Sequence, residues 1–309
     1  MARPPSRYAQ TYAHQFGGPT DVEYTFDRAE AVIFPVPFER TTSYGPGTRN
    51  GPREILLASS QVELWDEELG LDAHSRGLFT LPEMDLSHAS MEEAMQAIDE
   101  AAGDVLDAGK FLLTLGGEHS ITPPLVAAAA RRARGLSVLQ IDAHADLRDE
   151  YMGEPNSHAC AMRRVLDHAP IVQVGIRNLS EGEAVALPGL QTKIFYDWNM
   201  RDDPSWISRA VDALTDDVYV TIDLDGLEPG LMPAVGTPEP GGLSWRETTT
   251  RLRRVVEQRR VVACDVVELC PVPGLLSPNF VAARLVYKLL GYRAAATPAR
   301  DTLSRRPSA

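Results

Sequence analysis

Eight short apolar segments recur along the chain, and a longer segment of mixed polarity follows each of them. Several are continuously rich in Val, Ile, Leu and Phe, which is typical of strands buried on both faces of a sheet. The predicted strands are residues 31–36, 77–84, 110–115, 136–141, 171–176, 192–196, 218–222 and 261–269. The segments between them predict helices, so the pattern indicates parallel strands joined by crossover helices.

Several of the intervening segments contain residues that favour the start of a helix. Thr122, Asp203 and Ser277 each precede a proline, which predicts an N-cap followed by proline in the first turn. Residues 244–247, with the sequence SWRE, predict a capping box. Eight strand–helix units fit a closed barrel as well as an open three-layer sandwich. In both architectures functional residues collect at the carboxyl ends of the strands.

Side chains that bind metals follow four of the predicted strands. They are His119 in GGEHS after the third strand, Asp142, His144 and Asp146 in DAHAD after the fourth, Asp223 and Asp225 in DLDG after the seventh, and Glu268 at the end of the eighth. Each cluster alone is also compatible with a polar loop or a helix cap. Four clusters at the same end of one sheet indicate a shared site.

The four aspartates among these residues would place four carboxylates in one cavity. Two like charges about 4 Å apart repel by about 4 kcal/mol at an effective dielectric constant of about 20. Without cations, several of the carboxylates would therefore take up protons. Two divalent ions would balance the four charges and leave His119 and His144 as neutral ligands. Oxygen and imidazole donors without thiolate are typical of sites for Mn²⁺ or a similar ion and not of structural zinc sites. We therefore predict a dinuclear site for such ions.

Composition and charge exclude several classes of protein. The chain has 309 residues and a net charge of −13, which argues against nucleic-acid binding and is compatible with a small cationic substrate. Its length is compatible with two domains, but no linker divides it, so we predict one domain. Cys160, Cys264 and Cys270 are scattered and predict neither a disulfide framework nor a metal site. Without a signal peptide or an apolar run of about 20 residues, we expect a cytoplasmic protein that does not enter a membrane.

Six motifs, in sequence order, resemble those of the ureohydrolases, the arginase and agmatinase family. They are GGEHS, DAHAD, SHA, DLDGLEP, GTPEPGGLSW and DVVELCP, and the resemblance extends from about residue 41 to Tyr287. It implies a three-layer α/β/α sandwich on an eight-stranded parallel sheet, in place of the barrel. It also implies a single ureohydrolase domain over residues 1–309, with a motif-bearing core at about 31–291 and loose tails. A trimer or hexamer is the implied assembly.

The resemblance also implies a role for each motif residue. One manganese ion would be bound by His119, Asp142, Asp146 and Asp223, and a second by Asp142, His144, Asp223 and Asp225. Co²⁺, Ni²⁺ or Zn²⁺ could bind to the same donors. In this family a metal-activated hydroxide attacks the guanidinium carbon, and urea and an amine are released.

The same resemblance implies roles for three further residues. Glu268 would hold the guanidinium group, His158 would give a proton to the departing amine, and Thr237 would line the pocket. Alternatively, Glu268 could form a salt bridge at a strand end, and His158 could start a helix that Ser157 caps. One departure from the family is Cys270, where its members often have Asn.

The expected substrate depends on the loop LRDEYMGEPNSHA, residues 147–159. Arginases bind the substrate carboxylate with a polar loop at this place, whereas this loop carries Asp149, Glu150 and Glu154. Acidic side chains would repel a carboxylate and attract a distal ammonium group. They favour agmatine, hydrolysed to putrescine and urea, with aminopropylagmatine as a close alternative. Guanidinobutyrate, guanidine and arginine are weaker alternatives.

Two hypotheses come from other classes of protein. A zinc deacetylase of the same fold would use one Asp–His–Asp site and would leave His119 and Asp146 without a role. A non-catalytic metal-binding scaffold would not require His158 and Glu268. The pattern of residues therefore favours an enzyme.

Overall fold

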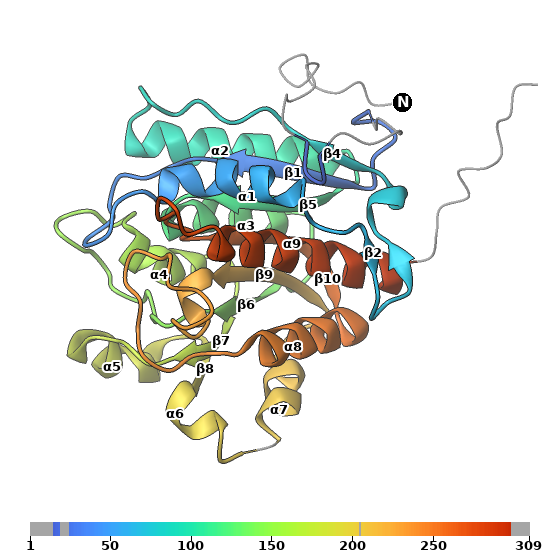
Figure 1. Ribbon diagram of the computed structural model, residues 1–309. Helices are drawn as coiled ribbons and strands as arrows, with labels where there is room; N and C mark the ends of the chain where they lie inside the picture. Colours follow the sequence, from blue (N-terminus) through green and yellow to red (C-terminus); the bar gives the residue numbers. More distant parts are fainter. Residues whose placement is uncertain (1–14, 19–24, 204, 298–309) are drawn as a thin grey trace, which may run out of the picture.

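An eight-stranded sheet forms the centre of the protein (Figure 1). The computed structural model describes residues 15–18, 25–203 and 205–297. The strands are β1 (Ala31–Val36), β4 (Leu78–Thr80), β5 (Phe111–Gly116), β6 (Ser137–Ile141), β7 (Ile171–Ile176), β8 (Thr192–Tyr196), β9 (Asp217–Asp223) and β10 (Arg260–Val267). Their order is β4-β1-β5-β10-β9-β6-β7-β8, and all neighbours are parallel. All eight predicted strands are confirmed, and the sheet is open.

Helices cover both faces of this sheet. One face carries α1 (Gly51–Ser59), α7 (Trp206–Asp212), α8 (Trp245–Gln258) and α9 (Ser277–Ala296), and the other carries α2 (Met91–Asp107), α3 (Thr122–Ala130) and α4 (Ala161–Val165). Figure 1 shows α1, α9 and α8 in a row across the first face. Because side chains alternate along a strand, Ile33 and Leu113 enter one core while Val32 and Leu112 enter the other. These layers confirm the α/β/α sandwich.

Shorter elements fill the connections. They are α5 (Glu181–Ala186), α6 (Asp197–Met200), η2 (Thr48–Asn50), η3 (His74–Arg76), η4 (His119–Ile121), η5 (His158–Cys160), η6 (Leu187–Gly189), η7 (Leu224–Gly226) and an antiparallel pair, β2 (Trp65–Asp66) with β3 (Leu71–Asp72). No helix among the described residues is both long and apolar enough to traverse a lipid bilayer. The loose tails that we expected fall largely on residues 1–14 and 298–309, outside the described residues.

The helix starts agree only in part with the sequence patterns. The capping box at residues 244–247 is confirmed, with both of its reciprocal hydrogen bonds. Thr122 and Ser277 are not N-caps, because each is already the first residue of its helix and makes no capping bond. Asp203 is not an N-cap either, because α7 begins at Trp206 and its N-cap is Ser205. Asp203 accepts a hydrogen bond from the Ser205 amide, and its partner in the motif, Pro204, lies outside the described residues.

The strand order brings distant parts of the sequence to one edge of the sheet. The strands β5, β10, β9 and β6 are consecutive neighbours, and the order of the strands along the chain reverses among them. Such a reversal is where α/β sheets bind ligands. Two glycines permit close chain approach there: a Cβ on Gly117 would lie 2.0 Å from the Phe38 carbonyl oxygen, and one on Gly226 would lie 2.8 Å from the Asp142 nitrogen.

Candidate metal centre

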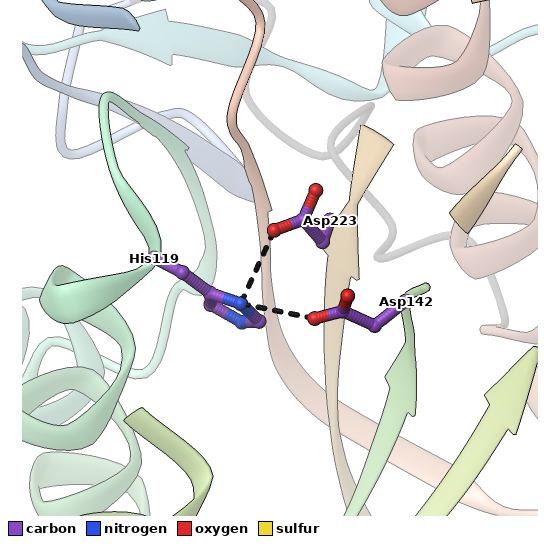
Figure 2. A group of neighbouring side chains, drawn as sticks. All are labelled: His119, Asp142 and Asp223. Atoms are coloured by element: carbon purple, nitrogen blue, oxygen red, sulfur yellow. Dashed lines mark ion pairs between the residues drawn. The ribbon is translucent and has the colours of Figure 1, made fainter. Parts of the chain in front are cut away.

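His119 faces three of the predicted aspartate ligands. Its Nδ1 lies 3.2 Å from Oδ2 of Asp142, 3.0 Å from Oδ2 of Asp146 and 3.3 Å from Oδ2 of Asp223. Figure 2 shows His119, Asp142 and Asp223 converging from three separate segments of the chain. Neighbouring ligand atoms around one ion, with bonds of about 2.1 Å at right angles, are about 3 Å apart. This group therefore has the spacing of a metal site.

A second group shares Asp142 with the first. Nδ1 of His144 lies 2.9 Å from Oδ2 of Asp225 and 3.7 Å from Oδ1 of Asp142. Asp142 thus turns one oxygen to each histidine, as a carboxylate that bridges two ions would. The backbone of Asp146 has φ 52°, a conformation that non-glycine residues adopt rarely and often at functional sites. The six predicted ligands all lie in these two adjoining groups.

Without metal ions, protons must balance the charge of this centre. Burial, together with the charge of Asp142, raises the pKa of Asp146 to about 6. Burial, with the charges of Asp225 and Asp142, raises the pKa of Asp223 well above its usual value. Although burial opposes its protonation, contacts with Asp142 and Asp225 raise the pKa of His144 to about 12. Divalent cations would replace these protons.

The surroundings of one buried atom also indicate that it is a metal ligand. Nδ1 of His119 is buried and has no hydrogen-bond partner among the described residues, although three carboxylate oxygens surround it. A buried nitrogen without a partner is costly unless something else binds its lone pair. A cation between this nitrogen and the carboxylates would satisfy all of them. The donor set, with oxygen and imidazole and no thiolate, fits Mn²⁺ or a related ion.

The other nitrogen of the His119 ring is held by a buried network of hydroxyl groups. Nε2 lies 2.9 Å from Oγ1 of Thr221, which donates to Oδ1 of Asp265 at 2.6 Å. Tyr219 and Thr122 donate to Oδ2 of the same carboxylate at 2.7 and 3.0 Å. Because Thr221 gives its only proton to Asp265, it accepts a hydrogen bond from Nε2–H of His119. The lone pair of Nδ1 is thereby directed at the metal centre.

Asp142 is oriented in a similar way from inside the sheet. Nε2 of Gln140 donates to Oδ2 of Asp142 at 2.6 Å, and Nε2 of Gln173 donates to Oε1 of Gln140 at 2.6 Å. Gln140, Gln173, Thr221 and Asp265 lie outside the residues predicted for the site. A signal was present, because each interrupts an otherwise apolar strand and a buried polar side chain requires a partner.

An open cavity lies above the metal centre. Besides ligand residues, its lining contains Thr42, Ser43, Tyr44, Arg148, Tyr151, His158, Asn178, Glu183, Thr237 and Glu268. Oε1 of Glu268 accepts the His119 amide proton at 2.7 Å, which leaves Oε2 for another partner. Glu268 has φ 67°. Among the described residues it forms no ion pair with a basic side chain, so the strand-end salt bridge is not observed.

His158 and Thr237 lie where the motifs predicted, at the wall of this cavity. His158 begins η5, but Ser157 makes no capping bond to that turn, so the capped-start alternative is not observed. Cys270, at the position where the family often has Asn, donates to the Pro46 carbonyl at 3.3 Å. It therefore contacts the loop that carries Tyr44, and it does not line the cavity.

The three acidic residues expected at the mouth are placed differently. None of Asp149, Glu150 and Glu154 lines the cavity. Asp149 points into solvent, with 81% of its side chain exposed, and pairs with Arg164 at 2.8 Å and Arg163 at 3.6 Å. Glu154 accepts a hydrogen bond from a backbone amide within its own turn. Local partners thus hold two of the three acids outside the cavity lining, and their attraction of a distal ammonium group stays a prediction.

Comparisons with known proteins identify the family. The model of the arginase family matches residues 29–291. The N(1)-aminopropylagmatine ureohydrolase of Synechocystis sp. is 42% identical over 273 residues, which cover 85% of this chain and 89% of that protein. The agmatinase of Bacillus anthracis is 32% identical over 254 residues, covering 80% and 86%. The crystal structure of the agmatine ureohydrolase of Thermoplasma volcanium superposes with a TM-score of 0.82 at 29% identity, covering 92% and 95%.

The match spans the described core of the chain, including every motif residue discussed above. The similar proteins are hydrolases acting on guanidino groups, as the six motifs predicted. The chain belongs to the arginase family and is a ureohydrolase.

Proposed function

We propose that this ureohydrolase acts on an agmatine-type amine and prefers N1-aminopropylagmatine to agmatine. The observation that carries the choice is the identity of 42% to an aminopropylagmatine ureohydrolase, against 32% to an agmatinase. The loop motifs alone favoured agmatine, so the comparison reverses the order of the two candidates. The products would be urea and spermidine from the longer substrate, or urea and putrescine from agmatine.

We propose two Mn²⁺ ions per chain as the cofactor. One would be bound by His119, Asp142, Asp146 and Asp223, and the other by Asp142, His144, Asp223 and Asp225. When bound, such a pair of ions supplies an acidified water as nucleophile and stabilises the charge of the transition state. The contacts of about 3 Å at His119 and the shared carboxylate of Asp142 support this assignment.

We propose that Glu268 binds the guanidinium group. One carboxylate oxygen is fixed by the His119 amide, so the side chain is oriented, and the other oxygen is left for the substrate. A charged hydrogen bond between a carboxylate and a guanidinium is stronger than a neutral one. His158 would give a proton to the departing amine, and Thr237 would contact the substrate at the pocket wall.

The amine tail would extend toward the surface past two aromatic rings. Tyr44 and Tyr151 line the cavity, and Tyr44 is 82% exposed. An ammonium group near such a ring gains cation–π stabilisation. Asp149, Glu150 and Glu154 lie outside the lining, so we propose that they attract the cationic substrate over a distance, together with the net charge of −13. The proposed assembly remains a trimer or hexamer.

Urea release by the Mn²⁺-loaded protein tests this proposal. Aminopropylagmatine, agmatine, arginine, guanidinobutyrate and guanidine would be compared at matched concentrations. We expect the highest kcat/KM for aminopropylagmatine, followed by agmatine. A higher kcat/KM for arginine or guanidinobutyrate than for both amines would contradict the proposed substrate class while leaving the ureohydrolase assignment in place.

A further inference from the structure

Thr41, in the loop that follows β1, connects His158 to a buried carboxylate. Its Oγ1 lies 3.1 Å from Nδ1 of His158 and accepts the His158 backbone N–H at 2.9 Å. The same oxygen donates to Oε1 of Glu118 at 2.9 Å. The sequence pattern gave no role to Thr41, or to Glu118 within the GGEHS motif.

The direction of these hydrogen bonds follows from the number of protons available. A hydroxyl group has one proton and can accept two hydrogen bonds. The backbone N–H of His158 can only donate, so it occupies one acceptor position on Thr41. A carboxylate is the stronger acceptor for the hydroxyl proton, so that proton is directed to Glu118. The remaining position on Oγ1 accepts a proton from Nδ1 of the His158 ring.

Glu118 is rigid enough to fix this arrangement. It is fully buried, and its Oε2 accepts the backbone N–H groups of Arg40 and Thr41, each at 2.7 Å. Its Oε1 also accepts the Ser120 hydroxyl proton at 2.6 Å. The side chain of Thr41 is therefore tied to the segment that carries the metal ligand His119. Nδ1 of His158 also has a longer contact of 3.4 Å with Oγ of Ser157, so Thr41 is its nearer partner. Nε2, on the other side of the ring, makes no hydrogen bond within the part of the chain that the structure describes.

We propose that Thr41 is a positioning residue that holds His158 with Nδ1 protonated and Nε2 toward the cavity. This inference rests on the proposed function, in which His158 serves the departing amine. As the bond between carbon and the amine nitrogen breaks, that nitrogen takes the proton from Nε2–H of the imidazolium. The ring is left neutral with its proton on Nδ1, and the hydrogen bond to Thr41 stabilises this tautomer.

Replacement of the hydroxyl by a methyl group tests the role of Thr41. Thr41→Val should lower kcat about 10-fold or more, with KM and metal content within about twofold, because the loss falls on proton transfer. Thr41→Ser, which keeps the hydroxyl, should restore most of the rate. The matched control is Thr48→Val, since the Thr48 hydroxyl bonds Glu39 and not His158. If Thr41→Val fails to fold, Thr41→Ala gives the same comparison.

A double-mutant cycle separates positioning of His158 from a general structural role. In a His158→Asn background, Thr41→Val should cause no further loss of kcat, because the group it positions is gone. An equal loss in both backgrounds would overturn the inference, as would full activity of Thr41→Val. Neither result would alter the proposed substrate, which the wild-type kinetics decide separately.

Discussion

The two ring nitrogens of His119 have different surroundings, one facing the metal ligands and the other Thr221. The two sides differ in how far the sequence predicts them. The ligand side was predictable, because histidine and aspartate at strand ends are chemically distinctive. The supporting side left only a weak signal, because Thr221 and Asp265 are single polar residues inside apolar strands. Their pairing depends on which strands lie next to each other, and the sequence pattern did not give that order. The role of Thr41 was not predictable either, because nothing in the sequence indicates that Thr41 lies next to His158.

The bond between His119 and Thr221 should matter for metal affinity. Thr221→Val keeps the shape of the side chain and removes the acceptor for Nε2–H, so the ring loses its orientation. Loss of such an outer hydrogen bond typically weakens metal binding about 10- to 100-fold. Titration of metal-free protein with Mn²⁺ measures the effect. Thr122→Val is the control, because Thr122 donates to the same Asp265 at 3.0 Å without contacting the ring. We expect Thr221→Val to bind Mn²⁺ more weakly than Thr122→Val.

Glu268 should act on the substrate and not on the metal. Glu268→Gln keeps the acceptor for the His119 amide but removes the charge that faces the guanidinium. We expect kcat/KM to fall about 10- to 100-fold, since a charged hydrogen bond to the one free oxygen contributes about 1.5–3 kcal/mol. Metal content should be unchanged. Loss of metal from this variant would show instead that Glu268 supports the centre.

The strands and helices were predictable to different degrees. Apolar runs identified all eight strands of the large sheet. Several of these runs were continuous, because a strand covered on both faces has almost no polar positions. The order of the strands was not derivable from the pattern, and the family resemblance supplied the sandwich. Thr122 was mistaken for an N-cap, because its hydroxyl is used by Asp265 instead. The position of Asp149 outside the cavity lining was not predictable, because the geometry of a loop depends on local partners such as Arg164.

The loop after β5 should tolerate no side chain at Gly117. A Cβ there would lie 2.0 Å from the Phe38 carbonyl oxygen, so Gly117→Ala forces the loop that carries His119 to move. We expect a loss of about 2 kcal/mol or more in the free energy of unfolding, measured with urea, together with weaker metal binding. Gly189→Ala is the control, because no atom of the described residues lies within 4 Å of its added Cβ. Equal stabilities of the two variants would contradict this packing.

The stability of the whole metal-free protein should fall as the pH rises. Asp146 and His144 have folded pKa values of about 6 and about 12, above their usual 3.8 and 6.5. Protonation of each group therefore stabilises the folded state. This stabilisation is complete below the pKa of the unfolded state, and it is lost as the pH rises through the pKa of the folded state. The raised pKa values of Asp223 and Asp225 act in the same direction.

Thermal unfolding with a chelator should accordingly show a Tm that decreases from pH 5 to pH 8. The Mn²⁺-loaded protein should not show this decrease, because cations replace the protons. The affinity of the metal-free protein for Mn²⁺ should weaken as the pH falls through about 6, the pKa of Asp146. A metal-free Tm that rises over the same range would contradict the charge balance inferred for the centre.

The number of metal ions in the active protein tests the dinuclear centre most directly. Metal content per chain would be determined by elemental analysis, alongside urea release, for the wild type and for Asp225→Ala. We predict two ions per wild-type chain, and for the variant a lower metal content with urea release reduced by orders of magnitude. Full activity with one ion per chain, or an Asp225→Ala variant that releases urea at the wild-type rate, would contradict the account.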